Sequence, residues 1–140
     1  MANLIERFSL MSVLTSLVGC GITGPAHDEP LPDVAAVVDM GFTSFEPDVV
    51  RIHAGQTVEW RNTAFITHSV SSDSTKAKSP NDASIPEGAR PLNSGDLLGG
   101  DIYLQTFMVP GTYKYFCTHY EDDGMVGTVI VDPAPRTLLK

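Results

Sequence analysis

Four side chains that can bind a soft metal ion stand out in this sequence: His68, Cys117, His119 and Met125. Cys117 comes directly after the strand-like run 112–116, which would place its thiolate at the end of a strand. A thiolate, two imidazoles and a thioether make up the ligand set of a trigonal copper site with a weak axial ligand. Because soft sulfur favours Cu(I) and imidazole binds both oxidation states, such a site would cycle between Cu(I) and Cu(II).

Two blocks of sequence around these residues resemble one protein family. Residues 107–131, FMVPGTYKYFCTHYEDDGMVGTVIV, resemble the copper-loop end of the cupredoxins, the small blue copper proteins of plastocyanin, pseudoazurin and halocyanin type. Upstream, Phe45-Glu46-Pro47 and then VVRIHAGQTVEWRNTAFITHSV resemble the family's strand, Ala-Gly turn and Val-x-Trp-x-Asn segment, which ends at the first copper histidine.

The resemblance implies both a fold and a metal site. The fold would be all-β, a cupredoxin-like Greek-key β-sandwich of about seven to eight strands. The site would be a type 1 site that holds one copper ion, with His68, Cys117, His119 and Met125 as the ligands.

One spacing departs from the family pattern. In the cupredoxins the second histidine comes three or more residues after the cysteine, whereas His119 comes only two residues after Cys117. The separation of Cys117 and Met125 still equals that of the plastocyanin-type loop. Two explanations remain open: the loop bends so that His119 reaches the same point in space, or Glu121 or Asp122 offers an oxygen ligand instead.

The N-terminal residues are typical of an exported lipoprotein. The apolar stretch 8–18 is too short to span a bilayer as a helix. It runs into Leu17-Val18-Gly19-Cys20, which resembles a bacterial lipobox. We expect residues 1–19 to be a lipoprotein signal peptide, Cys20 to carry the lipid and residues 20–32 to form a flexible tether. The alternative is an ordinary secretory signal with an incidental cysteine.

Cysteine usage agrees with a metal site. The chain has two cysteines, and if Cys20 is lipidated, Cys117 has no thiol partner. An unpaired thiol in an oxidising compartment is open to oxidation unless something occupies it. A bound metal ion is the natural occupant.

From Val34 onward the segments are short, β-branched or aromatic, and separated by turn residues, which indicates strands. We expect one domain at 33–133 and a C-terminal tail at 134–140. The expected strands lie near 34–40, 48–53, 56–62, 67–71, 102–108, 111–117 and 126–132. Residues 72–100 are rich in Ser, Asp, Pro, Asn and Gly, which favours a long irregular excursion with at most one helical turn.

The alternation of side chains along a strand separates the histidines. His53 shares a strand face with Arg51, so we expect it to be exposed and reject it as a ligand. His27 falls in the tether. Cys117 lies on the face opposite Lys114 and is expected to point inward. Ser69, next to His68, could hydrogen-bond near the thiolate and tune the site.

The chain is acidic, with 9 Lys and Arg residues against 17 Asp and Glu residues and a net charge of −8. This charge argues against nucleic acid and against an anionic membrane surface as electrostatic partners. The acidic run 121–123 follows His119 directly and could steer a cationic redox partner, such as a basic c-type cytochrome or a membrane oxidoreductase. A solvated turn is the alternative explanation of this run.

The resemblance implies an extracytoplasmic electron-transfer protein rather than an enzyme. It would be a monomer, held at the membrane by its lipid in the periplasm or at the cell surface, and electrons would leave through His119. The alternative function is a copper-binding module for storage, sensing or delivery. Such modules tend to be rich in Met or His at an exposed site, whereas residues 20–140 contain only Met40, Met108 and Met125. An oxidase fragment is less favoured, because one short domain lacks the further copper ligands that oxygen reduction needs.

Overall fold

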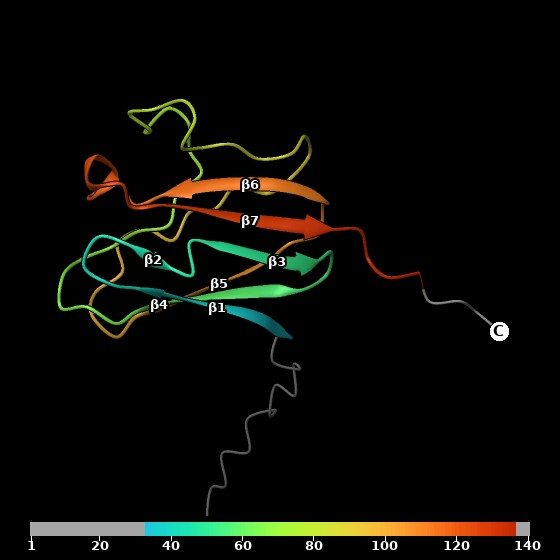
Figure 1. Cartoon of the computed structure of the whole chain (residues 1–140), viewed down its shortest axis with the longest axis horizontal. Coiled ribbons are helices and arrows are strands. Elements are labelled where there is room, and N and C mark those ends of the chain that lie inside the picture. Colours follow the sequence, from blue (N-terminus) through green and yellow to red (C-terminus); the bar gives the residue numbers. More distant parts are fainter. Residues whose placement is uncertain (1–32, 137–140) are drawn as a thin grey trace, which may run out of the picture. The chain divides into compact units, whose positions relative to one another are not determined.

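The computed structural model describes residues 33–136, which form two β-sheets packed face to face (Figure 1). One sheet has the strand order β2-β1-β4-β5 and the other has the order β3-β7-β6. The elements are β1 (Val34–Met40), β2 (Phe45–Glu46), β3 (Val49–His53), β4 (Thr57–Asn62), β5 (Ile102–Thr106), β6 (Gly111–Phe116), the 3₁₀ turn η1 (Glu121–Asp123) and β7 (Val126–Asp132). The all-β sandwich expected from the sequence is therefore confirmed.

The strand pairing brings distant parts of the chain to one end of the sandwich. β1 pairs in parallel with β4, so Met40 and Asn62 lie side by side at their C-terminal ends. β6 pairs antiparallel with β7, so Phe116 at the end of β6 lies opposite Val126 at the start of β7. We call this the Cys117 end, because Cys117 directly follows β6.

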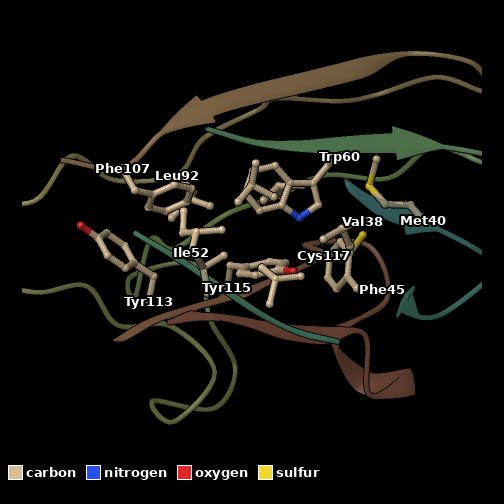
Figure 2. Close-up of a cluster of buried hydrophobic side chains, with 14 of the residues drawn as sticks. Val38, Met40, Phe45, Ile52, Trp60, Leu92, Phe107, Tyr113, Tyr115 and Cys117 are labelled. Carbon is tan, nitrogen blue, oxygen red and sulfur yellow. The ribbon is translucent and has the colours of Figure 1, made fainter. Parts of the chain in front are cut away.

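The core between the sheets is aromatic. The ring of Trp60 meets that of Tyr115 edge to face, with centroids 5.4 Å apart, and Phe107 meets Tyr113 in the same way at 4.8 Å. Figure 2 shows Cys117 at the end of this cluster, away from Phe107 and Tyr113. Burial of these large rings supplies much of the hydrophobic stabilisation of the domain.

Gly127 makes room for one of these rings. A Cβ atom at this position would collide with the ring of Tyr115, on the neighbouring strand β6. A glycine is thus required at position 127 because the Tyr115 ring approaches its backbone closely. This packing explains the last glycine of the Gly-Met-Val-Gly pattern at residues 124–127.

Two details of the expected strand pattern were wrong. Residues 67–71 do not form a continuous strand. They make isolated bridges, from His68 to Leu97 and from Ser71 to both Asn93 and Phe116. The segment changes partner along its length, so no regular ladder forms. The short strand β2 was not expected at all.

Other expectations hold or lie outside the described residues. Residues 72–100 contain no helix and no strand of more than a single bridge, as an irregular excursion requires. The predicted signal peptide, Cys20 and the tether to residue 32 fall outside the residues that the structure describes. Within 33–136, no helix is long and apolar enough to cross a membrane.

Candidate copper site

His68 and Cys117 meet in the interior at the Cys117 end. His68 Nδ1 lies 3.7 Å from Cys117 Sγ, and both side chains are 0% exposed. The other ring nitrogen, His68 Nε2, is buried and makes no hydrogen bond of normal geometry, although the Gly41 backbone lies near the ring. A fully buried imidazole and thiol, drawn together from positions 49 residues apart, form an unusual pair in a hydrophobic core and call for a bound group.

Asn62 shapes the turn that presents His68. Its buried side-chain amide donates to the carbonyl of Ile66 at 2.8 Å and to that of Leu97 at 2.9 Å, and its Oδ1 accepts from Ala64 N–H at 3.0 Å. His68 then exchanges both backbone hydrogen bonds with Leu97, at 3.0 and 2.8 Å. The asparagine of the Trp-x-Asn segment therefore sets the position of the histidine six residues later.

Cys117 and Met125 close the loop between β6 and β7. Cys117 N–H donates to the carbonyl of Met125 at 3.0 Å, and the Met125 side chain is 0% exposed in the same core cluster as Cys117. This single backbone hydrogen bond fixes the two sulfur-bearing residues as neighbours at the base of the loop. Met125 could therefore offer its thioether to a metal ion held by Cys117.

Ser69 takes the position near the thiol that its sequence neighbours suggested. Its Oγ lies 3.9 Å from Cys117 Sγ and accepts a hydrogen bond from Thr118 N–H at 2.9 Å. The hydroxyl thereby connects the segment that carries His68 to the loop that carries Cys117. Hydrogen bonding around a ligand sulfur is one of the means by which a protein tunes a copper site.

His119 lies at the surface of the same end. Its side chain is 39% exposed, and its Nε2 lies 2.8 Å from Asp96 Oδ1. In residues 33–136, no three His, Cys, Asp or Glu side chains converge as a metal site would require, so His119 does not join His68 and Cys117 as closely as they join each other. The ring of Tyr120 lies near both imidazoles, with its centroid 5.3 Å from that of His68 and 6.3 Å from that of His119.

The carboxylates of Glu121 and Asp122 turn toward another part of the chain. Glu121 is buried and accepts hydrogen bonds from Lys78 N–H, at 2.8 and 3.0 Å, and from Ser79 N–H at 3.0 Å. Asp122 pairs with the Lys78 ammonium. Both side chains therefore join η1 to the long excursion, and neither contacts Cys117.

Burial keeps His68 in the state that binds metals. Desolvation lowers the pKa of His68 below its ordinary value of 6.5, an effect that the Gly41 carbonyl opposes and the nearby His119 reinforces. The imidazole is therefore neutral at pH 7, with a lone pair on one ring nitrogen. Cys117 lies beside that ring.

His53, by contrast, is exposed and lies at the opposite end of the sandwich. Its Nδ1 lies 3.1 Å from the carbonyl of Pro133, and its strand neighbour Arg51 forms an exposed salt bridge with Asp132 at 2.7 Å. The alternation along β3 confirms the strand-face argument that rejected His53 as a ligand. His27 lies outside the described residues.

The donor atoms fit a copper ion. Imidazole nitrogen and thiolate sulfur bind a first-row metal at about 2.1 and about 2.3 Å. Two such donors on one ion, at an angle between tetrahedral and trigonal, are about 3.6 to 3.8 Å apart, and the observed separation of His68 Nδ1 and Cys117 Sγ is 3.7 Å. With the buried thioether of Met125, this is the mixed sulfur and imidazole set that selects copper.

Known proteins with similar sequences and structures lead to the same metal. Residues 32–132 match the model of the family described as copper binding proteins, plastocyanin/azurin family. The chain is 37% identical to plastocyanin of Scenedesmus fuscus over 97 residues, which is 66% of this chain and 91% of the relative. It is 30% identical to plastocyanin of Nostoc punctiforme over 134 residues, which is 91% of this chain and 94% of the relative.

The structure is also similar to solved cupredoxins. Amicyanin of Paracoccus versutus superposes with a TM-score of 0.54 and 27% identity, covering 74% of this chain and 86% of amicyanin. Plastocyanins and amicyanins are electron-transfer proteins that hold a single type 1 copper ion. The chain belongs to the plastocyanin/azurin family of copper-binding proteins.

Proposed function

We propose that this chain carries single electrons between redox proteins through one type 1 copper ion held by His68, Cys117, His119 and Met125. The observation that carries the proposal is the buried pair of His68 Nδ1 and Cys117 Sγ at 3.7 Å. Copper, when bound there, supplies a one-electron couple between Cu(I) and Cu(II). No substrate is transformed, so the protein is an electron carrier and not an enzyme.

The chain's contribution is a site that changes little between the two oxidation states. His68 is held by paired backbone hydrogen bonds to Leu97, and Cys117 by its bond to Met125. All four of these residues lie in the interior, where water is excluded. A rigid and dry site requires little rearrangement when an electron arrives or leaves, which favours fast transfer.

His119 is the proposed edge through which electrons enter and leave. Its ring is the exposed part of the proposed ligand set, and large apolar side chains are exposed on the neighbouring loops: Phe42 at 68%, Phe65 at 98% and Leu98 at 62%. The loops of Phe65 and Leu98 are close together, since a Cβ atom added to Gly99 would lie 3.5 Å from the Cα of Phe65. A backbone hydrogen bond of 3.2 Å from Thr63 to Met40 joins the segments that carry Phe65 and Phe42. We call these three side chains the apolar collar. Exposed side chains of this size suit docking against a partner's apolar surface.

The proposed partner is a redox protein, and the charge of this chain favours partners of opposite charge. The side chains of Glu121 and Asp122 bond to residues 78–79, whereas the exposed side chain of Asp123 makes no hydrogen bond within residues 33–136. The acidic run therefore mainly joins η1 to residues 78–79, and we call these contacts of Glu121 and Asp122 the clasp. The overall charge of −8 still favours a cationic partner, such as a basic c-type cytochrome.

We also propose that the chain is extracytoplasmic and anchored by a lipid on Cys20. Val34 begins β1 beside Thr57, at the end of the sandwich opposite Cys117. Within the domain, His119 and the apolar collar lie at the end opposite Val34. Mass spectrometry of the membrane-extracted protein tests this: the lipid should be on Cys20, and Cys20→Ala should abolish it.

The absorption spectrum of the copper-loaded protein tests the main proposal. An intense visible band from thiolate-to-copper charge transfer, bleached by a reductant and restored by an oxidant, is the expected result. A colourless protein that holds only Cu(I) would contradict electron transfer and favour storage or delivery of the metal. Among the methionines of residues 33–136, Met40 and Met125 are buried and Met108 alone is exposed, which argues against that alternative.

A further inference from the structure

Asp96 makes a hydrogen bond to the ring of His119, the proposed exit ligand. Its Oδ1 lies 2.8 Å from His119 Nε2, although the two residues are 23 positions apart. Both side chains are partly exposed, at 68% and 39%. The sequence offers no motif for this contact, since Asp96 belongs to the irregular excursion and His119 to the ligand loop.

The hydrogen bond determines which nitrogen of His119 carries the proton. An ionised carboxylate can only accept, so Nε2 must donate and keep its hydrogen. In a neutral imidazole the other nitrogen, Nδ1, then has the free lone pair. A carboxylate bonded to one ring nitrogen in this way fixes the tautomer and orientation of a metal-binding histidine and raises its basicity.

The backbone around Asp96 ties it to the other histidine as well. The next residue, Leu97, exchanges both backbone hydrogen bonds with His68. Two residues earlier, Ser94 donates its N–H to the carbonyl of Val70 at 3.0 Å and accepts from Val70 N–H through its hydroxyl at 2.8 Å. The segment 94–97 is thus paired with 68–70, and Asp96 is held between two anchored neighbours.

The charge of Asp96 is not neutralised by the lysine nearby. Asp96 lines a cavity of about 400 Å³ together with Ser69, Thr118 and Lys76. Lys76 pairs with Asp73 at 3.8 Å instead. The Asp96 carboxylate therefore pairs with His119 and not with Lys76.

We propose that Asp96 is a positioning residue of the copper site, which holds His119 in the Nε2–H tautomer with Nδ1 free to bind the metal and lowers the reduction potential. The sign follows from charge: a carboxylate on a ligand ring stabilises the more positive oxidised state, so reduction becomes less favourable. This inference rests on the proposed function, because it needs His119 to be a ligand.

Substitutions in the copper-loaded protein separate charge from orientation. Asp96→Asn keeps the shape and an acceptor oxygen but removes the charge. We expect the visible band to remain and the Cu(II)/Cu(I) equilibrium to shift about tenfold toward Cu(I), which for one electron is a rise of about 59 mV in potential. Asp96→Glu should return the potential toward that of the unmodified protein.

The matched control is Asp123→Asn, which removes the same charge from an exposed position of the ligand loop with no hydrogen bond to the ring. Its potential should rise much less. Equal shifts in the two variants would overturn the proposal, since Asp96 would then act only as one more surface charge. Loss of the band in Asp96→Asn without recovery in Asp96→Glu would also contradict it.

His119→Ala separates the two levels of inference. If this variant keeps an unchanged spectrum and potential, His119 is not a ligand and the role of Asp96 is wrong, while a reversible band in the unmodified protein still supports electron transfer. If the unmodified protein has no thiolate band, the proposed function fails first. A changed spectrum in His119→Ala, with the Asp96→Asn shift above, supports both.

Discussion

The buried and exposed halves of the site are held in place by different means. His68, Cys117 and Met125 are fully buried, and backbone hydrogen bonds, together with the Asn62 side chain, position them. The residues after His119 make backbone hydrogen bonds within their own turn, but the exposed His119 ring is held by Asp96, and η1 is joined to the excursion by Glu121. The strands and their connecting turns thus preorganise the inner half, whereas the outer half depends on side-chain contacts to the irregular excursion.

The largest effect should come from the inner half. In Cys117→Ser we expect complete loss of the intense visible band, because Cys117 is the sole thiol among residues 33–136. The domain should still fold, since the bond from the backbone N–H of residue 117 to Met125 remains. Absorption and far-ultraviolet circular dichroism measure the two outcomes. A serine variant that kept the band would show that the site is misassigned.

Substitutions in the outer half should change the stability of the protein more than its visible spectrum. Glu121→Gln removes the charge from a buried carboxylate that accepts from Lys78 and Ser79. Hydrogen bonds to charged groups contribute about 1.5–3 kcal/mol, so we expect the free energy of unfolding of the metal-free protein to fall by about that amount in urea denaturation. The reason is that a neutral amide accepts these backbone donors less strongly.

Asp122→Asn is the control for this clasp. Its pair with Lys78 has side chains that are 70% and 61% exposed, and exposed pairs contribute only about 0–1 kcal/mol. The asparagine variant should therefore lose less stability than Glu121→Gln. If the two variants lost the same free energy of unfolding, the buried contacts of Glu121 would be no stronger than the exposed pair of Asp122.

The inner half was the part that could be predicted from the sequence. Period-two alternation in β3 and β6 placed His53 outward and Cys117 inward, and both placements are confirmed. The Trp-x-Asn segment marked His68, and in the structure the Asn62 side chain holds the turn that presents this histidine. Regular strands and short turns are encoded by local patterns in the sequence, and for this reason they could be predicted.

The outer half could not be predicted, because its contacts join residues with no common pattern. Asp96 and His119 are 23 residues apart, and Glu121 and Lys78 are 43 apart. The conformation of an irregular loop decides such contacts, and no periodicity describes that conformation. The failure at 67–71 has the same origin, since that segment bridges to Leu97 at one end and to Phe116 at the other.

A smaller effect should come from the core behind the inner half. Tyr115 lies in β6, two residues before Cys117, and its buried hydroxyl makes no hydrogen bond of normal geometry. Burial raises its pKa above the ordinary value of 10.0, an effect that the nearby Trp60 indole partly opposes. Above about pH 10 the unfolded chain therefore loses this proton while the folded chain keeps it, so the free energy of unfolding falls as the pH rises.

Tyr115→Phe tests this by removing the hydroxyl and keeping the ring. At pH 7 we expect the free energy of unfolding to be unchanged or slightly higher, because an unpaired buried polar group is lost. Between pH 10 and 11 the phenylalanine variant should lose stability less steeply than the unmodified protein. A marked loss at pH 7 would instead mean that the hydroxyl has a partner in solution.

The smallest effect is expected at the end of the sandwich opposite the site. His53→Ala removes an exposed imidazole whose contact is the carbonyl of Pro133 at 3.1 Å, so the visible band and the potential should not change. His68→Ala, which deletes a buried ring 3.7 Å from Cys117 Sγ, should weaken copper binding severely. Each variant removes one histidine from the same domain. A copper titration monitored by absorption compares their copper affinities directly. If His53→Ala affected copper as strongly as His68→Ala, the division into a buried site end and an inert opposite end would be wrong.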